Sequence, residues 1–311
     1  MEKHDSAKYA FFYLLSLVAL VFLSISVGII VFQIINKEIV DIINDYAVNY
    51  NDGAMKFAIS SIIVSAPIYY LTSRQIYKNL FKGDLDKDAG VRKWLTYFIL
   101  LVSVVVMIGF LIATINSFLG GDLTTKFILK TLTALIISGT VFSFYLYDIR
   151  RENIQGQKNK VISLYAWVSL TLILVVFVFS WFVVDSPVET RNKKIDGEII
   201  SDLYEINSAV LNYYNTNDKI PADLDVLLNN PDGFRLSVQA IQHPNSDKYY
   251  DYEVLSDDEY KICADFLTSN MEDNIDRYYG NEYNHDGGYQ CFSQKVSSSN
   301  NKVPLEPVII R

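Results

Sequence analysis

Two cysteines, Cys263 and Cys291, are the residues with the most definite chemistry in this chain of 311 residues. No other cysteine occurs, and both lie in the last third of the sequence. An even number of cysteines in an oxidising compartment favours a disulfide. Two buried free thiols are the alternative. If the bond forms, it closes a loop of about 29 residues. The lower entropy of the unfolded chain would then stabilise the fold by roughly 3–4 kcal/mol.

A second group of candidate residues consists of oxygen ligands between residues 257 and 286. Calcium takes six to eight such ligands from carboxylates, amides and carbonyls. We single out Asp273, Asp276 and Asp286 as candidate calcium ligands. Their spacing does not fit an EF-hand, and a solvated acidic surface is the alternative. No other cofactor is expected.

Catalytic motifs are not apparent in the sequence. The three histidines, His4, His243 and His285, are too far apart for a zinc-hydrolase motif. There is no G-x-S-x-G nucleophile motif, and no glycine-rich loop of the kind that binds phosphate. The sequence therefore predicts a non-catalytic protein.

Five apolar segments in residues 1–185 are long enough to cross a bilayer, which takes about 20 residues per helix. They are residues 11–35, 54–72, 94–115, 127–147 and 161–184. None carries an ionisable residue at its centre, which argues against a proton-coupled pump. We therefore expect a five-helix transmembrane domain whose first partner is the lipid bilayer.

Lysine and arginine in the loops predict the orientation of these helices, because cytoplasmic loops are enriched in both. Lys37 and Lys126 are the two such residues on one side. Twelve lie on the other side: Lys3, Lys8, Arg74, Lys78, Lys82, Lys87, Arg92, Lys93, Arg150, Arg151, Lys158 and Lys160. This bias places the N-terminus in the cytoplasm and everything after the fifth helix outside it, in a protein of the cytoplasmic (inner) membrane.

Residues 186–296 are predicted to form an extracytoplasmic α+β domain, followed by a polar tail at 297–311. Ser186-Pro-Val-Glu189 has the form of a helix capping box, and apolar residues then recur with helical period. Residues 249–254, 260–267 and 288–296 have the composition of antiparallel strands. From residue 188 to 311 there are 22 acidic and 11 basic residues, a net charge of −11 that argues against nucleic acid.

The outer segment resembles the domain of type IV pilins and type II secretion pseudopilins. The resemblance rests on Asp202-Leu203, Ile206, Ala209-Val210 and Tyr213-Tyr214 in the helix, on Ile220-Pro221-Ala-Asp-Leu224 after it, and on Tyr252, Tyr260-Lys-Ile-Cys-Ala264 and Cys291-Phe292 in the strands. It implies a long helix packed on a small antiparallel sheet. No glutamate follows the start of the apolar helix at Lys160, unlike in pilins, so the resemblance implies a shared domain shape and not a pilus subunit.

The membrane half resembles an uncharacterised bacterial membrane family known as domain of unknown function 5671, which implies topology and no activity. Together these features predict an envelope protein that presents a pilin-like domain for protein interaction or assembly. The alternative is a transporter or channel component, or a sensor subunit, with the outer domain as lid or receptor.

Overall fold

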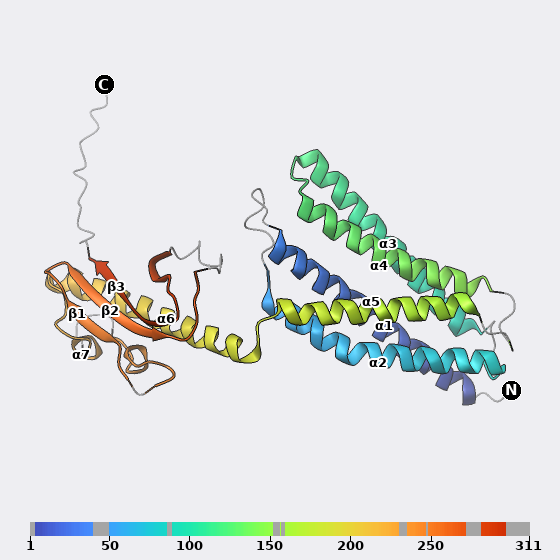
Figure 1. Ribbon diagram of the computed structural model, residues 1–311, viewed down its shortest axis with the longest axis horizontal. Helices are drawn as coiled ribbons and strands as arrows, with labels where there is room; N and C mark the ends of the chain where they lie inside the picture. Colours follow the sequence, from blue (N-terminus) through green and yellow to red (C-terminus); the bar gives the residue numbers. More distant parts are fainter. Residues whose placement is uncertain are drawn as a thin grey trace, which may run out of the picture. The chain divides into compact units, whose positions relative to one another are not determined.

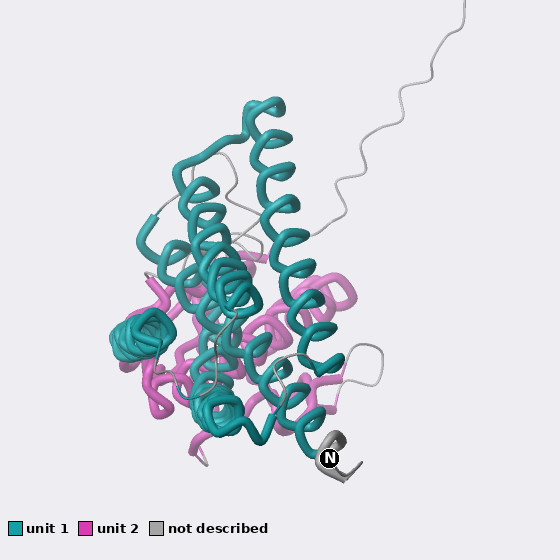
Figure 2. The backbone as a smooth tube through the Cα atoms, turned by 90° about the vertical axis from the view of Figure 1, so that its right-hand side faces the viewer, with its two compact units in different colours: residues 1–184 teal, residues 185–311 magenta. Residues whose placement is uncertain are grey.

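The computed structural model of this protein describes residues 4–39, 50–85, 89–151, 156, 159–229, 235–246, 248–271 and 281–296. The chain divides into two compact units, Met1–Val184 and Asp185–Arg311 (Figure 2). The first unit consists of helices, and the second combines helices with a small sheet (Figure 1).

Five long helices make up the described part of the first unit. They are α1 (His4–Glu38), α2 (Asp52–Lys82), α3 (Gly90–Gly120), α4 (Thr125–Ile149) and α5 (Lys160–Val183). Each of the five is long and apolar enough to cross a membrane. The prediction of five apolar helices is thus confirmed, and most of them extend beyond the apolar segments that the sequence indicates.

Side-chain caps determine where several of these helices begin. The side chain of Asn51 accepts a hydrogen bond from the Ala54 amide at 2.8 Å, and that of Thr124 accepts one from the Phe127 amide at 3.3 Å. Such caps satisfy amides that have no partner inside the helix. At the other end of α2, Gly83 has a φ of 80°, a left-handed conformation that favours glycine.

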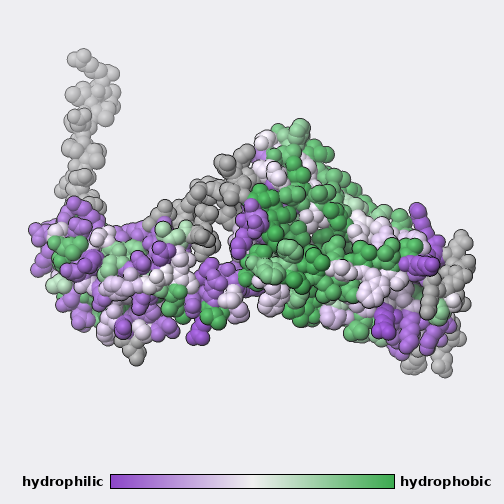
Figure 3. All heavy atoms as spheres, in the orientation of Figure 1, coloured by the Kyte–Doolittle hydropathy of each residue, from purple (hydrophilic) through white to green (hydrophobic). Residues whose placement is uncertain are grey.

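The outer surface of this unit is apolar. Leu119 is 77% exposed and Phe182 is 83% exposed. Hydrophobic residues cover most of the visible face of this unit (Figure 3). Exposed apolar area of this extent is unfavourable in water but suits contact with lipid chains. The protein is therefore a multi-pass membrane protein.

The interior of the first unit is built mainly between α1 and α2. Leu23, Val27 and Ile30 of α1 are buried together with Met55 and Ile62 of α2. Ile30 and Met55 are completely inaccessible to solvent. Association of membrane helices depends on packing of this kind, because lipid chains are as apolar as the side chains themselves.

The second unit is organised around α6 (Pro187–Asn217), the long helix that runs along the sheet in Figure 1. The Ser186 hydroxyl accepts a hydrogen bond from the Glu189 amide at 3.1 Å, as the capping box predicts. The apolar stripe of α6 is completely buried in the core of this unit; it consists of Ile199, Leu203, Ile206, Ala209 and Val210. Two short helices follow, α7 (Asp225–Leu228) and the 3-10 helix η1 (Gln239–Ile241).

Three antiparallel strands pair in the order β1-β2-β3. They are β1 (Asp251–Val254), β2 (Glu259–Phe266) and β3 (Gly288–Lys295), each within two residues of the predicted boundaries. A further 3-10 helix, η3 (Asn281–Tyr283), precedes β3. Tyr260, Ile262, Ala264 and Phe266 alternate along β2 and are buried in the same core as the apolar stripe of α6.

A carboxylate ties α6 to the end of β2. Asp196 is 3% exposed and accepts hydrogen bonds from the Leu267 amide at 2.8 Å, the Thr268 amide at 2.7 Å and the Thr268 hydroxyl at 2.5 Å. A buried carboxylate is tolerated when donors surround it in this way.

Candidate functional site

Three charged side chains meet inside the first unit. Arg92 near the start of α3 donates to the Asp148 carboxylate at 2.8 Å and to the Asp148 carbonyl oxygen at 3.1 Å. Arg151, just beyond α4, donates to the other carboxylate oxygen at 2.9 Å. Arg92 is 3% exposed and Asp148 is 4% exposed. We call these residues the charged triad; it carries a formal charge of +1.

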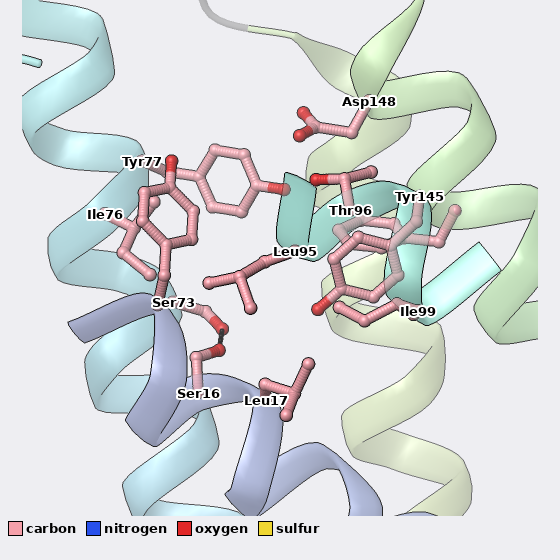
Figure 4. A pocket seen from close by; sticks show the side chains of 12 residues that line it. Ser16, Leu17, Ser73, Ile76, Tyr77, Leu95, Thr96, Ile99, Tyr145 and Asp148 are labelled. Carbon is pink, nitrogen blue, oxygen red and sulfur yellow. Dashed lines mark hydrogen bonds between the residues drawn. The ribbon is translucent and has the colours of Figure 1, made fainter. Parts of the chain in front are cut away.

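A small cavity lies beside the charged triad, between α1, α2, α3 and α4 (Figure 4). Its volume is about 30 Å³, which is room for little more than one water molecule. Polar side chains from all four helices line it: Tyr13, Ser16, Ser73, Tyr77, Thr96, Tyr145 and Asp148. The Ser16 and Ser73 hydroxyls are 3.3 Å apart and hydrogen-bonded.

The hydrogen bonds of the charged triad hold α3 and α4 together. Arg92 neutralises Asp148 and also satisfies the carbonyl of Asp148 at the last turn of α4, where carbonyls have no partner inside the helix. The Arg151 guanidinium also lies 6.0 Å from the ring centroid of Tyr77 on α2, a cation–π contact. Charges buried this deeply in a membrane protein often serve function as well as structure.

The sequence analysis missed the charged triad because it assigned Arg92 and Arg151 to cytoplasmic loops. In the structure α3 begins at Gly90 and α4 ends at Ile149, so Arg92 and Asp148 lie within helices. Helical spacing contained a signal: Arg92 falls on the same face as the buried residues Leu95, Thr96 and Ile99. Two of the twelve lysines and arginines that the sequence assigns to the cytoplasmic side are therefore engaged in buried ion pairs.

The second unit has an open pocket of about 640 Å³ beside α6. It is lined by Glu198, Asp202, Gln239, Gln242, His243, Pro244, Asn245 and Ser246. We call it the acidic pocket. Two carboxylates one helical turn apart on α6 form one wall, and η1 together with the segment after it forms the other.

Asp202 is the central carboxylate of the acidic pocket. The hydroxyl of Tyr250, a buried residue, donates to its Oδ2 atom at 2.8 Å. Burial raises the pKa of Asp202 to about 6; the nearby Glu205 and Glu198 carboxylates act in the same direction, and the Tyr250 hydroxyl and His243 oppose them. The charged form of Asp202 is thus poorly stabilised by its own protein.

His243 is fixed by two contacts of its ring nitrogens. The Asn245 amide donates to Nδ1 at 3.1 Å, and Nε2 lies 2.8 Å from the Asp265 carbonyl oxygen. These contacts connect the segment after η1 to β2.

The calcium site predicted from the sequence falls mostly outside the described residues and stays a prediction. Of the candidate calcium ligands, Asp273 and Asp276 lie outside the described residues, and Asp286 accepts a hydrogen bond from the Ser269 hydroxyl at 2.9 Å. Within the described ranges no group of three His, Cys, Asp or Glu side chains could hold a metal ion. His285 is buried and stacks on Phe266, with 3.7 Å between ring centroids.

The cysteines form the predicted disulfide. Cys263 of β2 lies directly opposite Cys291 of β3, and their Cα atoms are 4.0 Å apart. Cys263 is buried, whereas Cys291 is exposed. A stable disulfide is typical of proteins outside the reducing cytoplasm.

Comparison with known proteins supports the membrane half alone. The model of a family described as Domain of unknown function (DUF5671) matches residues 9–145. These residues therefore form a DUF5671 domain, which covers most of α1, all of α2 and α3 and most of α4, and includes Arg92. No curated protein and no solved structure matches the chain. None of these comparisons supports the resemblance of the outer segment to pilins.

Proposed function

We propose that this chain is a non-catalytic integral membrane protein of the bacterial cell envelope, whose helical bundle anchors a domain that binds another envelope protein. The N-terminus lies in the cytoplasm and residues 186–296 lie outside it. The observation that carries the proposal is the second unit itself. It has its own core, a disulfide and a strongly acidic sequence, which together suit a domain exposed to an oxidising exterior.

The shape of the outer domain is compatible with the pilin-like proposal. A 31-residue helix shares a core with a three-stranded antiparallel sheet, the arrangement that the resemblance implies. Four helices precede α5 in the sequence, so the domain cannot readily be extracted from the membrane into a filament. The pilin-like surface would then serve for docking to a partner and not for polymerisation.

A transporter, channel or sensor component is the second candidate, and the charged triad is the observation that favours it. Buried charges in membrane helices can line a substrate path. The cavity beside the triad, however, has room for little more than one water molecule, which favours a closed, structural cluster. Water accessibility of cysteines introduced along α2 and α4 distinguishes the two: a continuous labelled path supports transport.

Co-purification tests the interaction proposal. The full chain is solubilised in a mild detergent after chemical crosslinking in intact cells, and the crosslinked peptides are identified by mass spectrometry. We expect crosslinks from the outer-domain lysines Lys219, Lys248 and Lys261 to one envelope protein. Reproducible crosslinks from the cytoplasmic ends of the helices, with none from the outer domain, would contradict the proposal.

A further inference from the structure

The last turns of α2 carry a row of cations on their exposed face. Arg74, Lys78 and Lys82 follow one another at intervals of four residues, so they lie on one side of the helix, and all three are exposed. Ile76 and Leu80 on the opposite side are buried against aromatic residues of α1. The three cations, which we call the basic row, are therefore turned away from the interior of the bundle.

The start of α5 lies beside the basic row. The Tyr70 and Ser169 hydroxyls are hydrogen-bonded at 2.9 Å, which joins α2 to the middle of α5. Near the end of α2, the Phe81 carbonyl oxygen accepts a hydrogen bond of 3.1 Å from the Gly156 amide, four residues before α5 begins. The first two cations of the basic row lie between these contacts on α2. On the other segment Lys160, the exposed first residue of α5, lies between the same two contacts.

The surface that adjoins these cations is apolar. Leu71 on α2 is exposed one turn before Arg74, and Leu164 and Trp167 on α5 are exposed within two turns of Lys160. Such side chains suit contact with the acyl chains of lipid. Hydrophilic residues gather at the end of the first unit where α2 ends and α5 begins (Figure 3). The exposed surface of the two helices thus changes from apolar to cationic over a few turns.

We propose that the basic row and Lys160 bind the headgroup of an anionic phospholipid, whose acyl chains lie against the apolar surface beside them. A phospholipid changes from hydrocarbon to phosphate over a similarly short distance, and lysine and arginine are the side chains that bind phosphate. None of the ion pairs in the described part of the chain includes these four cations.

The number of cations favours a lipid with a net negative charge over a zwitterionic lipid. Each lysine or arginine near a membrane surface strengthens the attraction to anionic lipid about fivefold. A zwitterionic headgroup carries its own cation beside the phosphate and gains much less. The lysine and arginine bias assigns this end of the bundle to the cytoplasmic side, where the leaflet contains anionic lipids. The inference goes beyond the proposed envelope partner and does not depend on it.

The test compares two lipids that differ in the charge of the headgroup. The full chain in an uncharged detergent is mixed with dioleoylphosphatidylglycerol and dioleoylphosphatidylcholine at equal concentrations. Native mass spectrometry measures how much protein carries each lipid. We expect the complex with phosphatidylglycerol to exceed that with phosphatidylcholine at least about tenfold. Equal binding of the two lipids would overturn the proposal.

A pair of double variants assigns the selectivity to the proposed site. Arg74→Gln/Lys78→Gln changes two exposed side chains to another good helix former, so the fold should persist. We expect the two lipids then to bind within about twofold of each other. The matched control, Lys93→Gln/Arg150→Gln, removes two exposed charges from α3 and the end of α4 and should keep most of the selectivity. Equal losses in both variants would show unspecific attraction and would overturn the site.

Two further measurements identify the occupant. Trp167 becomes the only tryptophan when Trp94 and Trp181 are replaced by phenylalanine. Phosphatidylglycerol with brominated acyl chains should quench its fluorescence more than brominated phosphatidylcholine does, and Arg74→Gln/Lys78→Gln should remove the difference. Equal quenching by the two lipids would place the lipid elsewhere and contradict the proposal. Glycerol phosphate, the headgroup without acyl chains, should not displace the lipid at equal concentration; displacement would assign the cations to a free phosphate and overturn the lipid site.

Discussion

At the scale of single residues, the charged triad is a cluster in the membrane half whose disruption should reduce stability. Arg92 and Asp148 are separated by 56 residues in sequence and are both almost completely buried. Removing one member of a buried ion pair leaves an uncompensated charge in a medium that solvates it poorly. The three members are not equivalent, because the Asp148 carboxylate pairs with both arginines, one at each oxygen.

This difference predicts an order of effects on stability. Asp148→Leu removes the carboxylate that binds both buried guanidinium groups and should lower the free energy of unfolding by about 3–5 kcal/mol. Arg92→Met leaves the Asp148–Arg151 pair intact and should cost about 1–2 kcal/mol. Thermal unfolding in detergent, followed by circular dichroism, measures both.

Lys56→Ala is the matched control, because its ion pair with Asp52 is about one-third exposed and solvent screens it. It should cost about 0–1 kcal/mol. If Asp148→Leu were no more destabilising than Lys56→Ala, the charged triad would not be a structural clamp.

A substitution at Asp202 should raise the stability of the protein, whereas substitutions in the charged triad should lower it. Its pKa is about 6 in the folded protein, above the value of 3.8 for an unperturbed aspartate, so the folded state holds this proton more tightly than the unfolded state. Stability contributed by Asp202 is therefore fully present below pH 4 and is lost as the pH rises through about 6.

Asp202→Asn should consequently stabilise the protein at pH 7.5 and have no effect at pH 4. We expect the midpoint of thermal unfolding of the outer domain to rise by about 1–3 °C at pH 7.5. Differential scanning calorimetry of wild type and variant at both pH values is the measurement. A variant that is less stable at pH 7.5 would show that the charged carboxylate supports the fold.

At the scale of secondary-structure elements, the disulfide gives a further prediction. It joins neighbouring strands β2 and β3 across a connection that contains little apolar sequence between residues 268 and 286. Replacing both Cys263 and Cys291 by alanine should lower the stability of the outer domain by roughly 3–4 kcal/mol. The helices α1 to α5 should keep their stability.

Limited proteolysis and thiol counting test this prediction together. Cleavage between β2 and β3 should become faster in the double variant, while fragments of the membrane helices stay unchanged. Denatured, unreduced protein should contain no free thiol and reduced protein two. Two free thiols before reduction would contradict the disulfide.

Most elements of this fold could be predicted from the sequence, because each depends on local patterns. The capping box at Ser186, the apolar stripe from Ile199 to Val210 and the alternation in β2 all involve residues within a few positions of each other. The strands were predicted to within two residues for the same reason.

The candidate sites could not be predicted in this way, since they depend on pairing across long stretches of chain. Arg92 contacts Asp148 only after α3 and α4 have packed against each other. Asp202 contacts Tyr250 only after the sheet has packed on α6. A charged residue near the end of an apolar segment resembles a loop residue in sequence. Burial distinguishes the two, and burial is a property of the tertiary structure.

At the scale of the whole molecule, the account depends on where the outer domain lies. The lysine and arginine bias of the loops and the disulfide both indicate an extracytoplasmic position for the second unit. The envelope partner and the disulfide lose their proposed roles if this unit is cytoplasmic. Orientation is therefore the central claim.

Labelling of single introduced cysteines in intact cells tests that claim most directly. Ser208 lies on the exposed face of α6, and Lys78 lies on the exposed face of α2 near its end. Each is replaced by cysteine in a separate variant. The native cysteines do not react, because they form a disulfide. A membrane-impermeant maleimide should label Ser208→Cys in intact cells, and Lys78→Cys only after the membrane is permeabilised. Labelling of Lys78→Cys in intact cells, with Ser208→Cys protected until permeabilisation, would contradict the account.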